Sequence, residues 1–423
     1  MSKATHPAIS SSLQLVLAAA LFFFSGASSL IYEVVWVKVL SLQFGSSAWS
    51  IATVIASFMA GLGAGGAWAG RRADRSTRPL LAYSAIELGI ALYGLASIFL
   101  LENVSGLLYP LYGLVDGQFG LFVLAQFLLS FLMLALPTFL MGASLPLLIV
   151  AVSRQGAFAR QVALLYGVNT LGAAAGTALA GTFLLPTLGI SNTVWVAVGL
   201  GVLVAAGGLL LGRSAGRRQI AEEPGAAAEP APVSPLLLAV MAVAGGLGII
   251  YQIAWTRLLV PVVGSSTYAF TVILTTVLLG IGVGALLAAL PFVKRRSDWS
   301  VVGVALGVSS VTALAGLAAV NGLPQLFTAL AQGTGGSTWL LFGAQGVLAA
   351  SIVWCPAAAW GPPCLWALPS GTIGPVRRAG PWASSTRPIP VGRSPVRCWP
   401  ALCSCRGWAP AARCGWPRFW ALP

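Results

Sequence analysis

Two acidic residues lie at membrane depth in this sequence, Glu33 near the outer end of the first long apolar run and Glu87 within the third, where a carboxyl group could bind a proton. Glu33 is in Ser-Leu-Ile-Tyr-Glu-Val-Val-Trp, and Glu87 is in Ala-Ile-Glu-Leu-Gly. An ionised group at the centre of a membrane helix costs about 2.5 to 3.5 kcal/mol, so it usually faces a cavity or a partner. Both acids are therefore candidate functional sites. For Glu33 the alternative is a structural ion pair with Lys38, about one helical turn away.

The surroundings of Glu33 occur twice in the chain. Tyr32 and Tyr251 are 219 positions apart (251 minus 32), and this offset aligns the flanking residues without a gap. The offset gives three pairs: Glu33 with Gln252, Lys38 with Arg257, and Glu87 with Leu306. Both acids thus have neutral counterparts. A proton-binding role would therefore belong to the first half only, whereas the chain as a whole is two copies of one unit.

Other polar side chains in the apolar runs have simpler interpretations. Gln126 and Asn169 are expected to form hydrogen bonds between helices. Lys38 and Arg257 could attract an anionic group, or their side chains could extend to the lipid headgroups. The loop that contains Arg71, Asp74 and Arg75 could pair with helix ends as a gate, or it could act only as a topological anchor.

The sequence predicts neither a cofactor nor a metal site. The glycine run at 61–65 lies in an apolar segment and opens no strand-turn-helix unit, so it predicts close helix packing instead of dinucleotide binding. The cysteines all follow residue 354, none forms a Cys-x-x-Cys pair, and the only histidine is His6. Metal binding is therefore not expected.

The composition is that of a polytopic membrane protein whose partner is the lipid bilayer. Of 423 residues, 58% are hydrophobic and only 8% are charged, with a mean hydropathy of +0.90. The net charge of +14 comes from short basic clusters between apolar runs. This pattern indicates membrane topology and excludes a nucleic-acid groove.

The first half, residues 1–212, has six apolar runs long enough to span a bilayer. They are residues 13–32, 49–70, 80–101, 119–152, 162–185 and 193–211. We expect the fourth to tilt or break at Pro137 or Pro146. If every run spans, the basic loops share one side, so the positive-inside rule predicts a cytoplasmic N-terminus in the inner (plasma) membrane.

A cytoplasmic linker is predicted at residues 213–235, and a second, incomplete set of four spans at 236–354. These spans are residues 236–255, 268–292, 301–320 and 339–354. From residue 355 to 423 the repeat is lost, and the sequence is rich in Trp, Pro, Arg and Cys. Two hypotheses remain open for this tail: a disordered basic segment, or a frameshifted and truncated product.

Several motifs together resemble the membrane part of bacterial fused spermidine synthases. They are Ser-Gly-Ala-Ser-Ser-Leu-Ile-Tyr-Glu-Val-Val-Trp at 25–36, Gly-Arg-Arg-Ala-Asp-Arg at 70–75, Ile-Glu-Leu-Gly at 86–89, Leu-Pro-Thr-Phe-Leu-Met-Gly-Ala-Ser-Leu-Pro at 136–146 and Tyr-Gly-Val-Asn-Thr-Leu-Gly-Ala at 166–173. The resemblance implies a major-facilitator-like region that precedes an aminopropyltransferase domain. No motif of that enzyme domain is found here, so no catalytic residue is assigned.

The expected fold is all-α, with two helical bundles that are related as parallel repeats. The first bundle has six spans, and the second is incomplete, with four spans. The first functional hypothesis is the membrane region of a spermidine synthase-like fusion protein that handles a polyamine or another small solute. The alternatives are a stand-alone secondary transporter with a proton-coupled carboxylate at Glu87 or Glu33, and a non-functional truncated product.

Overall fold

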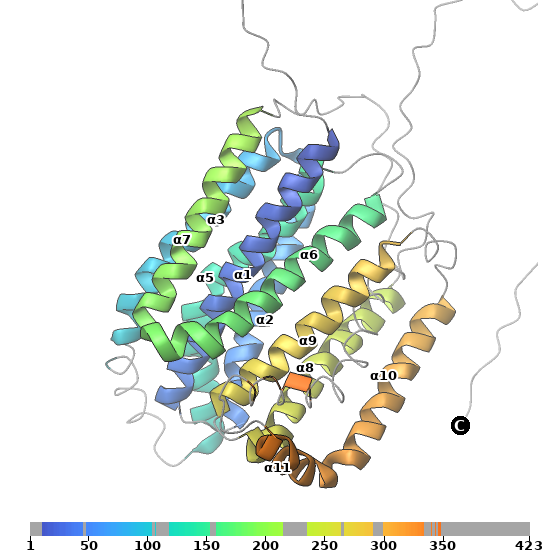
Figure 1. Ribbon diagram of the computed structural model, residues 1–423. Helices are drawn as coiled ribbons and strands as arrows, with labels where there is room; N and C mark the ends of the chain where they lie inside the picture. Colours follow the sequence, from blue (N-terminus) through green and yellow to red (C-terminus); the bar gives the residue numbers. More distant parts are fainter. Residues whose placement is uncertain are drawn as a thin grey trace, which may run out of the picture. The chain divides into compact units, whose positions relative to one another are not determined.

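Helices make up every regular element in the part of the chain that the structure, a computed structural model, describes (Figure 1). The described residues are 11–44, 48–103, 106, 118–152, 158–214, 235–263, 266–290, 299–333, 340, 343, 346 and 347. All belong to the first of two compact units, Met1–Val376 and Arg377–Pro423. The expected all-α class is confirmed for these residues. The tail at 355–423, nearly all of the linker at 213–235 and most of the run at 339–354 lie outside them.

Long helices cover the predicted apolar runs that lie in the described part of the chain. In the first half they are α1 (Ser11–Phe44), α2 (Ala48–Arg72), α3 (Pro79–Glu102), α5 (Phe119–Val152), α6 (Phe158–Leu179) and α7 (Leu185–Ser214), with the short elements η1 (Ala73–Arg75) and η2 (Ala180–Leu184). In the second half they are α8 (Pro235–Val263), α9 (Ser266–Ala288), α10 (Trp299–Ala319), η4 (Val320–Gly322) and α11 (Leu323–Gly333). The sequence did not predict α11, which at 11 residues is too short to span a bilayer by itself.

Eight described segments are long and apolar enough to cross a membrane. One of them, Arg160–Ser214, has 55 residues and contains both α6 and α7. It turns at Gly189, whose φ of 76° is readily adopted only by glycine. The segment therefore holds two of the predicted spans, and the chain has the architecture of a multi-pass membrane protein.

Successive helices of the first half run in opposite directions, as two hydrophobic clusters show. One cluster joins the starts of α1, α3 and α6 to the ends of α5 and α7 and to η1 after α2, through Ala18, Ala73, Leu80, Val152, Leu165 and Leu211. The other joins the opposite ends, through Phe44, Ile51, Leu129, Leu184 and Val194. The exposed arginines Arg71, Arg160 and Arg213 are close to these helix ends in the chain and therefore lie at the same end as the start of α1.

The first helix of each half is longer than hydropathy predicted. α1 continues for 12 residues beyond residue 32 (44 minus 32), and α8 continues for 8 beyond residue 255 (263 minus 255). The two helices end at corresponding positions of the repeat. The prediction was too short because Glu33 and Lys38 lower the local hydropathy, whereas tertiary packing buries the residues between them. Glu33 therefore lies inside α1, 11 residues before its end (44 minus 33), and the prediction that it lies near the outer end of this helix was wrong.

The helix α5 is continuous through both of its prolines, so the expected break does not occur. Pro137 has no N–H group and cannot donate to the carbonyl of Met133, one turn earlier. The hydroxyl of Tyr93 on α3 donates to that carbonyl instead. The neighbouring Thr138 hydroxyl donates to the carbonyl of Leu134 at 2.6 Å. The Tyr93 side chain thus satisfies the carbonyl that Pro137 would otherwise leave unpaired.

Glycines let two helices, α2 and α6, approach their neighbours closely, as the small-residue patterns predicted. A Cβ atom at Gly65 on α2 would overlap the backbone of Phe139 on α5. Cβ atoms at Gly172 and Gly176 on α6 would overlap the backbone of α1. Gly63, in contrast, has nothing within 4 Å of such an atom, so only one side of the α2 glycine run is a packing face.

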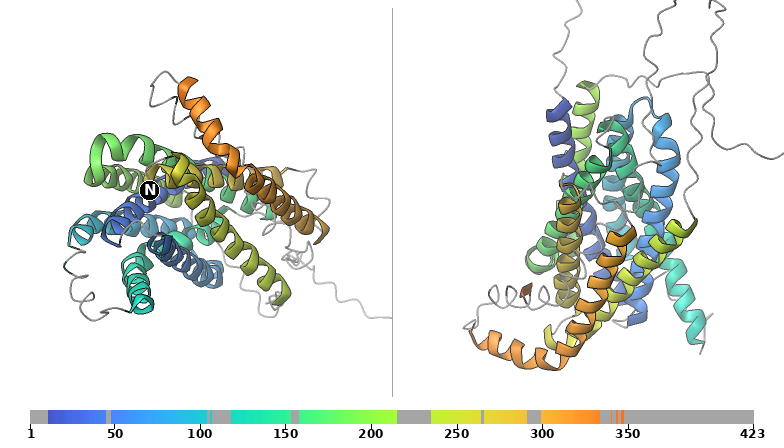
Figure 2. Two further views of the ribbon diagram at one scale, coloured as in Figure 1. Left: turned by 90° about the horizontal axis from the view of Figure 1, so that it is seen from below. Right: turned by 90° about the vertical axis from the view of Figure 1, so that its right-hand side faces the viewer.

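The two halves meet where α9 packs against α6, side by side in both views of Figure 2. Gly167, early in α6, lies beside Leu286, late in α9, and Gly181 in η2 lies beside Thr271, early in α9. α9 is therefore antiparallel to α6 and runs in the same direction as α2, its counterpart at the offset of 219. The α10 helix packs mainly with η4, and α11 with η4 and α8.

Candidate functional site

Glu87 lies inside the first helical group and is held by a hydroxyl group of α1. The Ser25 hydroxyl donates to a carboxyl oxygen of Glu87 at 2.7 Å. Glu87 is 1% exposed and Ser25 is 3% exposed. This hydrogen bond ties α1 to α3 with both partners withdrawn from solvent. A hydroxyl leaves the charge on the carboxyl uncompensated when the acid is ionised.

Two tyrosines beside this pair have unused hydroxyl groups. Tyr83 is one helical turn before Glu87 on α3, so the two residues share a face. Tyr32 lies on α1, where its ring packs over Gly94 of α3 and stacks on Trp36. Both tyrosines are fully buried, and neither hydroxyl makes a hydrogen bond of good geometry with a described residue, although the Tyr83 hydroxyl lies within reach of Glu87 and Ser25.

Further hydroxyl groups of this region bind backbone carbonyls of α7. The Ser28 hydroxyl donates to the carbonyl of Ala197, and the Ser84 hydroxyl donates to that of Ala205, both at 2.9 Å. These bonds connect α1 and α3 to the same helix. They fix the seam between α1 and α3 in which Glu87 lies.

Glu33 is buried and has no partner among the described residues. Its side chain is 2% exposed and makes no hydrogen bond or ion pair there. Gln252, its counterpart on α8, is also buried. The second copy thus places an uncharged group of the same shape at the corresponding position. A buried carboxylate without a partner is costly, so Glu33 must be protonated or must receive a cation.

The alternative ion pair between Glu33 and Lys38 is not formed. Residues five positions apart point about 140° away from each other around an α-helix. The Lys38 ammonium group instead donates to the Thr267 hydroxyl of α9 at 3.0 Å, which links the two halves. Arg257, the counterpart of Lys38, is exposed on α8.

Gln126 and Asn169 form the expected hydrogen bonds between helices. The Gln126 amide on α5 donates to the carbonyl of Phe44 on α1 at 3.4 Å. The Asn169 amide on α6 donates to the carbonyl of Phe22 on α1 at 2.8 Å. Both side chains therefore serve helix packing, with no part in a site around the two acids.

The residues of the predicted basic loop are exposed. Arg71, Asp74 and Arg75 lie at the end of α2 and in η1, and Asp74 makes no ion pair among the described residues. The guanidinium group of the neighbouring Arg72 lies 4.8 Å from the centre of the Trp68 ring. An exposed Trp and Arg pair of this kind is typical of a helix end at a membrane surface.

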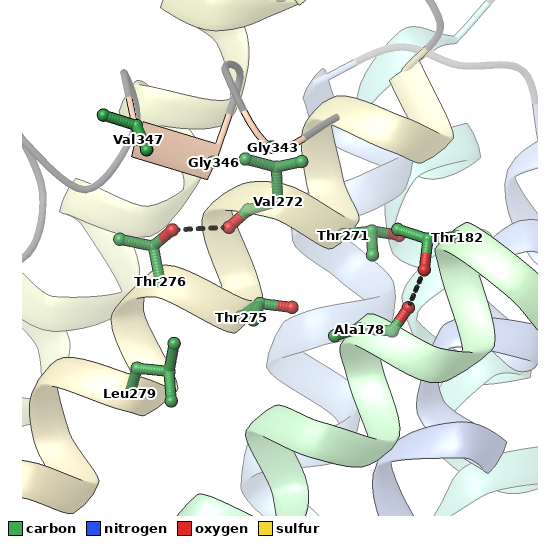
Figure 3. Close-up of a pocket in the computed structure, with 10 residues that line it drawn as sticks. All are labelled: Ala178, Thr182, Thr271, Val272, Thr275, Thr276, Leu279, Gly343, Gly346 and Val347. Carbon is green, nitrogen blue, oxygen red and sulfur yellow. Dashed lines mark hydrogen bonds between the residues drawn. The ribbon is translucent and has the colours of Figure 1, made fainter. Parts of the chain in front are cut away.

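A cavity of about 550 Å³ lies between α6, α9 and the residues Gly343, Gly346 and Val347 (Figure 3). Three hydroxyl groups on its wall, those of Thr182, Thr271 and Thr276, donate to carbonyls of their own helices. The Thr275 hydroxyl is buried and has no partner among the described residues. Its described lining residues are mostly apolar, and none of them is acidic or basic. The described lining therefore offers no counter-charge for a cationic solute.

The α6 and α9 contact next to the cavity can be tested by a disulfide. A Cβ atom at Gly181 would lie 2.7 Å from that of Thr271. Disulfides need a Cβ separation of about 3.5–4.5 Å, which a small shift provides. In a variant whose six native cysteines are replaced by serine, Gly181→Cys with Thr271→Cys should cross-link on oxidation. After cleavage at a protease site placed in the linker at 213–235, the halves should stay joined without reductant.

The matched control for this cross-link is Gly181→Cys with Thr276→Cys. Thr276 lies about 140° around α9 from Thr271, so this pair should not join the fragments. Equal cross-linking of both pairs would contradict the observed helix contact.

The sequence reading singled out Glu87 but missed the hydroxyl groups around it. Tyr83 could have been found, because its spacing of four residues before Glu87 places both on one helical face. Ser25 gives no such signal, since it lies on another helix 62 positions away. Serine is also common in membrane helices, where it mostly binds its own backbone.

The geometry defines a class of protein: a helical, multi-pass membrane protein with two acids buried in its first helical group and no described cation beside either one. The described residues contain no cluster of three or more His, Cys, Asp or Glu side chains that could hold a metal ion. No protein-family model matches the chain, and no curated protein matches its sequence.

Proposed function

We propose that this protein binds a small organic cation of the polyamine class within its membrane region, through the Glu33 carboxylate. The observation that carries the proposal is the burial of Glu33 without a hydrogen-bond donor or cation in the described chain. A protonated amine would supply the missing charge and up to three N–H donors. Gln252, the counterpart of Glu33 in the second half, is neutral, so the negative charge of this site is present only in the first half.

We also propose that this chain is related to the membrane region of bacterial fused spermidine synthases. The motifs at 25–36, 70–75, 86–89, 136–146 and 166–173 carry that resemblance. The matching ends of α1 and α8, and the shared direction of α2 and α9, support a parallel repeat of the major-facilitator type. We also propose that the arginine-rich helix ends face the cytoplasm from the inner membrane.

Retention of radiolabelled spermidine by proteoliposomes tests the proposed function. Liposomes that contain the purified full chain should retain more spermidine than protein-free liposomes, and unlabelled polyamine should compete. An uncharged solute of similar length should neither be retained nor compete, because Glu33 selects by charge. Equal retention with and without the protein would overturn the proposal.

A further inference from the structure

We propose that Glu87 is a reversible proton-binding site built by α1 and α3, separate from the cation site at Glu33. Its components are the Glu87 carboxyl, the Ser25 hydroxyl 2.7 Å away and the buried Tyr83 hydroxyl one turn earlier on α3. Proton binding at Glu87 does not depend on the proposed polyamine function. Any coupling between proton binding at Glu87 and movement of the cation rests on the proposed polyamine function.

Hydroxyl partners suit a carboxyl that changes its protonation state. A hydroxyl can donate one hydrogen bond and accept two, whereas Lys and Arg only donate and would hold the acid in its ionised form. When Glu87 is ionised, Ser25 and Tyr83 can both donate to it. When Glu87 takes a proton from water, it becomes a neutral acid and its own O–H can donate to one of these hydroxyl oxygens. Neither state leaves the acid without hydrogen bonds.

Among the described residues, none provides a fixed counter-charge beside Glu87. α5 and α7, which pack against α3, contribute no titratable group except Arg213 at the exposed end of α7. The charged or titratable residues of α1 and α3 other than Glu87 are Tyr32, Glu33, Lys38, Tyr83, Tyr93 and Glu102. The ammonium group of Lys38 binds Thr267, away from this seam. A proton is therefore the available means of neutralising Glu87.

The buried hydroxyl contacts of Glu87 favour a proton over a larger cation at this position. Glu87, Ser25 and Tyr83 are 1%, 3% and 0% exposed, respectively. The Ser25 hydroxyl already donates to Glu87 at 2.7 Å, whereas Glu33 has no such partner among the described residues, and a proton adds no volume to the Glu87 site. The Ser25 to Glu87 bond also joins α1 to α3, so a change of protonation acts directly on the contact between two helices.

Infrared difference spectroscopy of the purified full chain between alkaline and acidic buffer tests this site. Acidification should produce a carboxylic-acid C=O band from Glu87, because that group gains the proton. Glu87→Gln should remove this component. Glu33→Gln and the exposed control Glu102→Gln should both retain it. A spectrum of Glu87→Gln that equals the wild-type spectrum would overturn the proposal.

Two milder variants test the role of the hydroxyl groups and guard against misfolding of Glu87→Gln. Ser25→Ala and Tyr83→Phe each remove one partner, so the C=O component should remain and shift to higher frequency. An unshifted band in both variants would overturn the assignment of these hydroxyls. Because the spectra need no polyamine, a failed spermidine assay with a positive spectrum would reject only the proposed function.

Discussion

Replacing Glu33 by glutamine should lower the affinity for spermidine by about 10- to 100-fold while the protein remains folded. A charge-assisted hydrogen bond contributes about 1.5–3 kcal/mol, and 1.4 kcal/mol corresponds to a factor of ten in affinity. Glutamine keeps the size of the side chain and removes the charge. Glutamine already occupies the corresponding buried position of α8, as Gln252, which indicates that a buried helix position of this kind tolerates the amide.

The affinity of each variant can be measured by equilibrium binding of radiolabelled spermidine to detergent-purified protein. Glu102→Gln is the matched control, because it removes the same charge from an exposed position at the end of α3. This control should bind as the wild type does. A Glu33→Gln protein that is monodisperse and binds spermidine with unchanged affinity would exclude Glu33 as the cation site.

Adding a single methyl group at Gly65 should strongly destabilise the protein, whereas the same change at Gly63 should not. The Cβ atom of Gly65→Ala would overlap the backbone carbonyl of Phe139, so α2 and α5 would have to move apart. Overpacking of this kind costs about 1–3 kcal/mol, and more where backbone atoms cannot yield. Gly63→Ala meets open space and also favours the helical conformation.

Size-exclusion chromatography after a series of heating steps measures this difference in stability. Gly65→Ala should lose its monodisperse peak at a lower temperature than the wild type. Gly63→Ala should keep the wild-type midpoint. Equal midpoints for the two variants would contradict the close packing of α2 on α5.

Hydropathy located the helices well but misplaced some of their ends. The run at 119–152 coincides with α5, because a bilayer requires an apolar surface over a fixed length. The end of α1 was placed 12 residues too early (44 minus 32). Hydropathy averages composition along the chain, whereas the burial of Glu33 depends on neighbouring helices that such an average does not include.

The prolines of α5 also show what a prediction from sequence alone leaves open. A proline predicts a missing backbone hydrogen bond, and that prediction is sound. Whether the helix breaks depends on what replaces the bond. Here the replacement for Pro137 is the hydroxyl of Tyr93, which belongs to a different helix.

The sequence by itself determined the membrane class, the helical fold, the offset of 219 and the two acids at membrane depth. These properties follow from composition and spacing along one chain. Only the tertiary structure decided that Gly65 and not Gly63 touches α5, that Ser25 binds Glu87, and that Lys38 binds Thr267 instead of Glu33. Each of these contacts depends on how a helix is rotated against its neighbour. That rotation is set by the packing of many side chains together, which spacing within one helix does not specify.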